Sequence, residues 1–448
     1  MIMNQIALGD PASGWLILSG DSVSPPFIRA SYQSVFSPGA QATESLEIHL
    51  EGAPAVITAA LESLEKVIQR ARLNERSGSP GPQFLRFQPA AGGEYFYAAL
   101  TDLHLETPPN AWATHQIGSL PVTLHFTRPN HFDSDEIELP LTTRSVSDQL
   151  GGVSLINHFD AHPGHSNSVL IKPADVAGAL PAPLRIELTN THPAGYLHDL
   201  LIGIFHHPNL IAEQVFTCHA SEIAGGESFS NPNAINETYV RFQWSSTSLT
   251  ALGTWLFSNE DVRDLSGRFF RPLLHFYNSH AWPDLLLKLK LQAGSYILAE
   301  YEAIWSDPEF KYAVFPPLKI PPNPLLLEGL PHHIDLVLYG QHNAAGTYQI
   351  EIDALTLLPL DYAAFFLAFY DVPENAIFIE DNFRRLHNVR FSAIGSETVA
   401  HVRQGGDLLI HPDEYNRVIF TLTDQDDEID IFRTGSVRLF YRKRVRIL

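Results

Sequence analysis

Apolar and polar residues alternate along much of the chain, and this alternation predicts a protein built mainly of β-strands. In the segment 45–52, Leu46, Ile48 and Leu50 lie on one face, as expected of a strand with one buried side. The segment 122–127 alternates in the same way. Within the first 145 residues, further strands are expected at 84–87 and 94–103.

One segment of this first region departs from the strand period and predicts a helix over 54–73. Apolar residues recur there at spacings of four, three and four, at Ile57, Leu61, Leu64 and Ile68. That spacing gives one apolar face of an amphipathic helix. Pro54 suits a first helical turn, and the Ser-Gly-Ser-Pro-Gly cluster at 77–81 ends the helix. Residues 1–145 are therefore expected to form a β-sandwich with one inserted helix.

Residues 146–360 carry strand periods with no helical period between them. The expected strands are 168–171, 184–189, 200–205, 239–244, 285–291, 296–305, 334–339 and 348–358. This succession favours a jelly-roll β-sandwich like a carbohydrate-binding module. The proline-rich stretch 315–331 suits an extended connection and not a central strand. Residues 361–448 are expected to form a smaller C-terminal β region.

The charge balance argues against tight nucleic-acid binding. The 448 residues include 29 Lys and Arg against 50 Asp and Glu, a formal net charge of −21. A phosphate-binding groove needs clustered cations, and the dense basic stretch is the C-terminus, with Arg442, Lys443, Arg444 and Arg446. An acidic surface could instead let DNA slide past without holding it.

Cysteine content and hydropathy set further limits. The single cysteine, Cys218, excludes an internal disulfide and a structural zinc site built from cysteines. It lies in an apolar stretch and is interpreted as a small core residue. The first 20 residues have no basic region of a secretory signal. The longest apolar run, 354–370, is interrupted by Pro359 and Asp361, so no membrane span is expected.

The densest group of possible metal ligands is NHFDAHPGHSN, with His158, Asp160, His162 and His165. Imidazole and carboxylate groups bind zinc and other divalent ions. The spacing matches no helical arrangement, however, and turn and hydrogen-bonding roles are the alternative for Asp160 and Asn167. His-His pairs at 206–207 and 332–333 lie beside prolines in expected loops. We predict no metal site and no cofactor.

The sequence matches none of the catalytic motifs considered. A glycosidase needs two carboxyl groups facing each other across a cleft, whereas Glu300 with Glu302, and Glu351 with Asp353, each share one strand face and are interpreted as solvated. No P-loop, G-x-G-x-x-G, G-x-S-x-G or H-E-x-x-H motif occurs. No catalytic residue is therefore predicted. Aromatic side chains that could stack on a sugar are Trp244, Trp255, Trp282 and Trp305.

Several segments together resemble virion structural proteins of tailed phages and their prophage relatives, of the distal-tail or tail-tube type. In the first region the order is SLEIHLEG, then ITAALESLEKVIQRARL, PQFLRF, EYFYAALTDLHLE and LPVTLHFTRPNHF, covering about residues 40–142. The central stretch from INHFDAHPGHSNSVLI to LLIGIF, closed by IEIDALTLLPLD, is similar to the jelly-roll domain that follows in such proteins. The segments LLIHPDEYNRVIFTLTD and SVRLFYRKRVRIL resemble its last strands. The family has no active site to carry over.

The resemblance implies a structural component of a phage-like tail that assembles in the host cytoplasm into homo-oligomeric rings or tubes with other virion proteins. The leading hypothesis is thus a virion structural protein and not an enzyme. A second hypothesis is a glycan-binding module that contacts a host receptor. A third is a divergent glycoside hydrolase.

Overall fold

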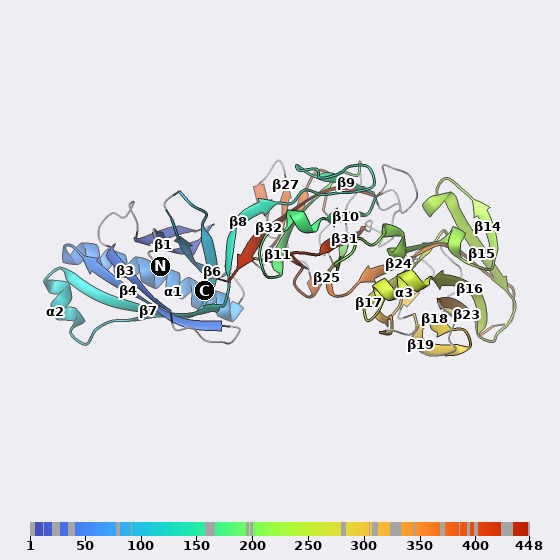
Figure 1. Ribbon diagram of the computed structural model, residues 1–448, viewed down its shortest axis with the longest axis horizontal. Coiled ribbons are helices and arrows are strands. Elements are labelled where there is room, and N and C mark those ends of the chain that lie inside the picture. The colour runs from blue at the N-terminus through green and yellow to red at the C-terminus, as the bar shows by residue number, and fades with distance from the viewer. Residues whose placement is uncertain are drawn as a thin grey trace.

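The computed structural model confirms the prediction of a mainly β protein. It describes residues 5–11, 13–19, 27–34, 41–77, 81–90, 92–156, 166–193, 197, 200–278, 284–303, 305–306, 312–322, 333–344, 346–367, 372–384, 386–391, 395–397, 402–422 and 433–446. Figure 1 shows three lobes in a row, which we call the N-terminal, middle and distal lobes. Each lobe surrounds its own large hydrophobic core. Across these residues, no helix is long and apolar enough to cross a membrane.

The N-terminal lobe is a strongly curved set of antiparallel strands that covers one long helix. Its elements are β1 (Gln5–Asp10), β2 (Gly14–Ser19), β3 (Phe27–Ser34), β4 (Gln41–Glu51), α1 (Pro54–Ser77), β5 (Gln83–Gln88), β6 (Phe96–Glu106), α2 (Ala111–Gln116), β7 (Ser119–Pro129) and β8 (Phe132–Glu138). Strands β3, β4, β7 and β6 lie side by side, and β6 also pairs with β5 and β8.

Helix α1 confirms the predicted helix and runs four residues beyond its expected end. Its buried face includes Ile57, Leu64 and Ile68, which share a core with Leu46 and Ile48 of β4. The apolar face of helix α1 packs on the apolar face of strand β4. The residues that gave the helical and the strand patterns in the sequence therefore share one core.

The middle lobe is a sandwich of two sheets. Its elements are β9 (Val153–Ile156), β10 (Ser168–Ile171), β11 (Ala182–Asn190), β12 (Leu200–His207), β25 (Tyr362–Leu367), β26 (Ile377–Asp381), β27 (Leu386–Phe391), β28 (Gly395–Glu397), β29 (Val402–Gly405), β30 (Leu409–Ile410), β31 (Tyr415–Leu422) and β32 (Thr434–Val445). One sheet has the order β10-β31-β12-β25-β29, and the other contains β32, β11, β26 and β27.

The distal lobe is a second sandwich. Its elements are β13 (Thr217–His219), β14 (Glu227–Ser230), β15 (Thr238–Trp244), β16 (Thr250–Phe257), α3 (Asn259–Leu265), β17 (Phe269–Phe276), β18 (Leu286–Ala293), β19 (Tyr296–Glu302), β20 (Trp305–Ser306), β21 (Tyr312–Val314), β22 (Leu318–Lys319), β23 (Ile334–Gln341) and β24 (Tyr348–Pro359). One sheet runs β14-β15-β24-β17-β21-β20, and the other runs β16-β23-β18-β19.

The lobes are nested along the chain, and this differs from the expected division into 146–360 and 361–448. Strands β10, β11, β12, β25, β26, β30, β31 and β32 share the core of the middle lobe, while the distal lobe is inserted between β12 and β25. The expected C-terminal β region therefore completes the sandwich that the central region begins. Part of the expected proline-rich connection, residues 323–331, lies outside the described residues.

The last strand, β32, joins the N-terminal and middle lobes. It pairs with β11 along one edge, and with β9 and then β8 along the other. The basic residues near the C-terminus make ion pairs and hydrogen bonds across this joint. Arg444 Nε lies 2.7 Å from Asp133 Oδ1, and Lys443 Nζ lies 2.6 Å from Glu94 Oε2. Arg442 donates to the carbonyl of Ser134 at 3.0 Å.

We expect Arg444→Gln to destabilise the protein, because it leaves the buried Asp133 carboxylate without its ion pair. Burial already raises the pKa of Asp133 and Arg444 opposes that rise. Removal of one partner of a buried pair costs about 3–5 kcal/mol. A carboxyl whose pKa is raised in the folded state contributes less to the free energy of unfolding as the pH rises. The deficit in the free energy of unfolding should therefore be larger at pH 8 than at pH 4.5.

Urea denaturation at the two pH values measures this deficit. Lys288→Gln is the matched control, because Lys288 pairs with the exposed carboxylate of Glu302 on the distal lobe and such pairs contribute at most about 1 kcal/mol. An equal, pH-independent loss in both variants would contradict the prediction.

Candidate functional site

Two carboxylates on β24 are buried, so their interpretation as a solvated face is wrong. The carboxylate of Glu351 accepts hydrogen bonds from Arg241 Nε at 2.9 Å and from Asn278 Nδ2 at 2.5 Å. Arg241 is its cross-strand neighbour on β15, so the pairing register explains the ion pair. Asp353 accepts from the backbone N–H of Ile235 at 2.8 Å. The alternating sequence did not reveal the burial of Asp353, because the short 3-10 segment Ile235–Glu237 that contacts it lies outside the strand pattern.

The environment of Asp353 keeps its carboxyl group protonated at neutral pH. Burial raises the pKa of Asp353 to about 8, and the hydrogen bond from Ile235 lowers it only in part. Next to this pair, the rings of Tyr239 and Tyr277 stack with centroids 4.2 Å apart. A carboxyl in an ion pair, that of Glu351, and a protonated carboxyl, that of Asp353, thus lie on a single strand and not across a cleft. The glycoside hydrolase hypothesis gains no facing pair from them.

The other carboxylate pair behaves as predicted. Glu300 and Glu302 on β19 are exposed and lie 2.9 and 3.2 Å from the ammonium groups of Lys290 and Lys288 on β18. These are cross-strand neighbours on a solvated sheet face.

The second candidate site lies where the middle lobe meets the distal lobe. His206 is near the end of β12, which ends before Pro208. His411 and Glu414 belong to the turn between β30 and β31. The side chain of Asn416 closes this turn with two hydrogen bonds. It accepts one from the N–H of His411 at 2.8 Å and donates one to the carbonyl of His411 at 2.9 Å. Asp413 adopts a φ of 62°, a turn conformation that aspartate tolerates.

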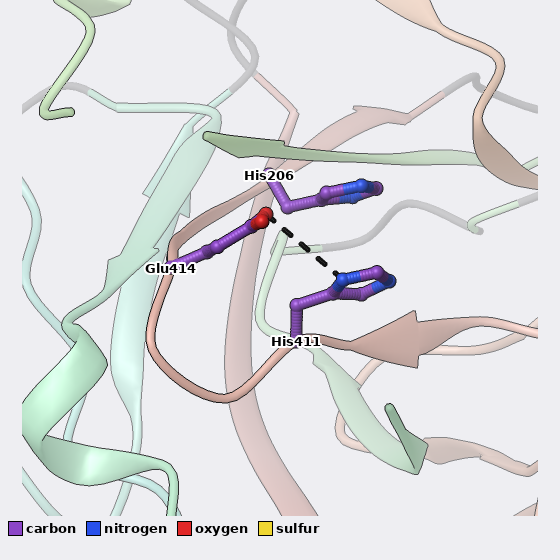
Figure 2. Close-up of side chains that lie close together, drawn as sticks. All are labelled: His206, His411 and Glu414. Atoms are coloured by element: carbon purple, nitrogen blue, oxygen red, sulfur yellow. Dashed lines mark ion pairs between the residues drawn. The ribbon is translucent and has the colours of Figure 1, made fainter. Parts of the chain in front are cut away.

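Figure 2 shows the imidazole rings of His206 and His411 face to face, with the carboxylate of Glu414 at their side. The ring centroids are 3.9 Å apart and the planes differ by 10°. His411 Nδ1 lies 3.9 Å from Glu414 Oε2, and its Nε2 lies 3.2 Å from the hydroxyl of Tyr362. One ligand atom from each of the three residues lies within 4.8 Å of the others.

Both imidazoles are neutral at physiological pH. Burial lowers the pKa of His206 to about 3, helped by His411 and by the cationic Arg268. Burial also lowers the pKa of His411, although the charges of Glu414 and Asp361 oppose it. Neutral imidazole has a free lone pair and is the form that binds metals.

Arg268 fixes the backbone around this group. Its guanidinium donates to Asp361 Oδ2 at 2.6 Å and to the carbonyl of His206, and it lies over the ring of Phe205 at 4.9 Å. Asp361 immediately precedes β25, so the arginine ties together the two chain segments that connect the lobes.

The structure gives different outcomes for the residues considered from the sequence. His158, Asp160, His162 and His165 lie outside the described residues, as does His332. Asn167 is buried and donates to the carbonyl of Phe420 at 2.9 Å, which confirms a hydrogen-bonding role.

Aromatic and sulfur side chains of the distal lobe have core roles where they are described. Cys218 is buried in the distal core, as predicted, and burial raises the pKa of its thiol. Trp244 and Trp255 are buried there too, so they form no exposed sugar platform. Trp282 and the side chain of Trp305 lie outside the described residues.

The sequence alone does not predict the group formed by His206, His411 and Glu414. Each part was visible: a His-His pair closes an apolar strand, and a His-Pro-Asp-Glu turn begins another. The missing information was that β12 and β31 are neighbours, with His206 opposite Asn416. About 200 residues separate these segments, and no local period links them.

Comparison with known proteins assigns no family. No protein-family model matches the chain, and no curated protein matches it. One solved structure with partial similarity is the phage P2 baseplate in its activated conformation with Ca, at 8% sequence identity and a TM-score of 0.27 over all of both chains. A likeness at that level carries no argument for a shared fold or function.

We expect Asp353→Asn to flatten the pH dependence of stability. A carboxyl with a pKa of about 8 when folded and about 4 when unfolded holds an extra proton in the folded state. The free energy of unfolding then falls by up to about 1.4 kcal/mol per pH unit from pH 5 to 8. The variant should lack this decline, as measured by urea denaturation at each pH.

Glu300→Gln is the matched control, because Glu300 is exposed and its pKa is lowered by Lys290. It should retain the wild-type slope between pH 5 and 8. Equal slopes for wild type and Asp353→Asn would refute the raised pKa.

Proposed function

We propose that this protein is a structural component of a phage-like tail or virion and that it assembles into homo-oligomeric rings or tubes through its N-terminal lobe. The observation that carries the proposal is an exposed apolar pair at the end of that lobe. Trp112 is 78% exposed and Ile117 is 80% exposed. Exposed tryptophan is unusual on a monomer surface and common at the centre of protein interfaces.

The segment that carries this pair is held in place and not left loose. His115 of α2 lies 3.0 Å from the carbonyl of Pro54 and 3.1 Å from the hydroxyl of Thr58, both at the start of α1. Gly52 donates to the carbonyl of Gly118 at 3.0 Å. A preorganised apolar surface loses little conformational entropy on association, which favours its use as a contact.

The arrangement of the lobes suits a building block of an assembly. Figure 1 shows α2 at the end of the molecule opposite the distal lobe, and the continuous path β6-β8-β32-β11 connects the first two lobes by hydrogen bonds. A contact through α2 would therefore project the distal lobe away from the ring. The excess of 50 acidic over 29 basic residues suits a conduit that does not retain DNA.

Replacement of the apolar pair should weaken self-association. We expect the wild-type chain to form rings or short tubes in negative-stain images at micromolar concentration and to sediment as an oligomer. Trp112→Ala with Ile117→Ser should raise the dissociation constant at least about thirty-fold, the effect of a hot spot worth about 2 kcal/mol.

Leu256→Ser is the matched control, because Leu256 is 60% exposed but lies on β16 of the distal lobe. It should leave the oligomer intact. Isolated wild-type monomers at high concentration would count against the assembly role. A wild-type oligomer that persists in the double variant would place the contact elsewhere.

A further inference from the structure

We propose that His206, His411 and Glu414 form a binding site for a divalent transition metal, with Zn²⁺ as the best probe, at the joint between the middle and distal lobes. Two imidazole nitrogens and a carboxylate oxygen are the ligands that Zn²⁺ takes in three-residue protein sites. Their ligand atoms lie within 4.8 Å of one another. This proposal is independent of the assembly role.

The contacts of His411 orient it as a ligand. Its Nε2 is 3.2 Å from the hydroxyl of Tyr362, and its Nδ1 faces Glu414 Oε2 at 3.9 Å. If Nε2 carries the proton and donates to Tyr362, the lone pair of Nδ1 points toward the carboxylate. Metal-binding histidines are held in the same way, by a hydrogen bond from the other ring nitrogen.

The other two residues offer buried atoms that lack hydrogen bonds. Within the described part of the chain, neither His206 Nδ1 nor Glu414 Oε2 has a hydrogen-bond partner. A buried acceptor without a partner costs about 1–3 kcal/mol, and a bound cation would satisfy both atoms. Figure 2 shows the carboxylate beside the two rings, in a position to share an ion with them.

Nearby charges allow a cation. The charge of Arg268 lowers the pKa of both imidazoles, but it is offset by Asp361, 2.6 Å away. Glu414 adds a negative charge to the site.

Metal binding requires a small rearrangement that would stiffen the joint. Ligand atoms on a tetrahedral Zn²⁺ lie about 2.0–2.2 Å from the ion, so the three atoms must draw together and one ring must rotate out of the parallel stack. The site would then cross-link β12, which leads into the distal lobe, with the turn before β31. The fourth position remains open to water.

Isothermal titration of the full-length, EDTA-treated chain with ZnCl₂ tests the site, followed by Co²⁺ absorption spectroscopy. We expect one site per chain with a micromolar dissociation constant and the visible bands of four-coordinate Co²⁺. His411→Gln and Glu414→Gln should each weaken binding at least ten-fold. Tyr362→Phe should weaken it less, because it removes only the orienting hydrogen bond.

Two controls separate this site from the other histidines among the 21 in the chain. His207→Gln changes the adjacent residue, whose ring stacks on Phe205, and should bind normally. His162→Gln with His165→Gln removes the other histidine-rich segment and should also bind normally. Circular dichroism confirms that each variant is folded. Loss of binding in this double variant, or unchanged binding in both Glu414→Gln and His411→Gln, would overturn the proposal, as would absence of binding at 100 µM ZnCl₂.

Discussion

The pairing of β32 with strands of two lobes is the constraint on which the rest of the structure depends. Val437 and Leu439 of this strand are buried in the middle core. The end of the strand, residues 440–445, pairs with β8 of the N-terminal lobe. The arginines there neutralise carboxylates that burial would otherwise penalise. The dense basic stretch at the C-terminus is therefore used for internal contacts. Because β32 follows the distal-lobe segment in the sequence, the middle sandwich is completed by strands from both sides of that segment.

Local periodicity was sufficient to predict the element types. The helix at α1 and the strands at β5, β10, β12, β15 and β24 appear close to their predicted bounds, because each has one face or both faces in a core. Helices α2 and α3 were not predicted. The first buries none of its residues, and the second spans only Asn259–Leu265 with a Ser258 cap, so neither is long enough to show a period. The grouping of strands into lobes depends on pairings between distant segments, which no local pattern specifies.

The same limit explains the candidate sites. Glu351 and Asp353 alternate with apolar residues, so the sequence indicates a polar strand face but not that the face is covered. His206 and His411 each lie at the end of a strand, and only the pairing of β12 with β31 brings them together. Polar residues at strand ends come close together where two lobes meet, because the chain enters and leaves the sheets there. The buried ring nitrogen of a half-buried histidine such as His206 needs a partner for its lone pair.

The insertion of the distal lobe has a consequence for how such a protein can diversify. The chain leaves the middle sandwich along β12 and returns along β25, and these strands are hydrogen-bonded neighbours with Ile204 opposite Tyr362. The two ends of the insert therefore lie side by side, and the sheet that anchors them is complete without it. A different domain whose ends lie equally close could take that place without disturbing the other two cores. The architecture thus separates a scaffold of two lobes from an inserted third lobe, so the insert can change while the cores of the other two lobes are kept.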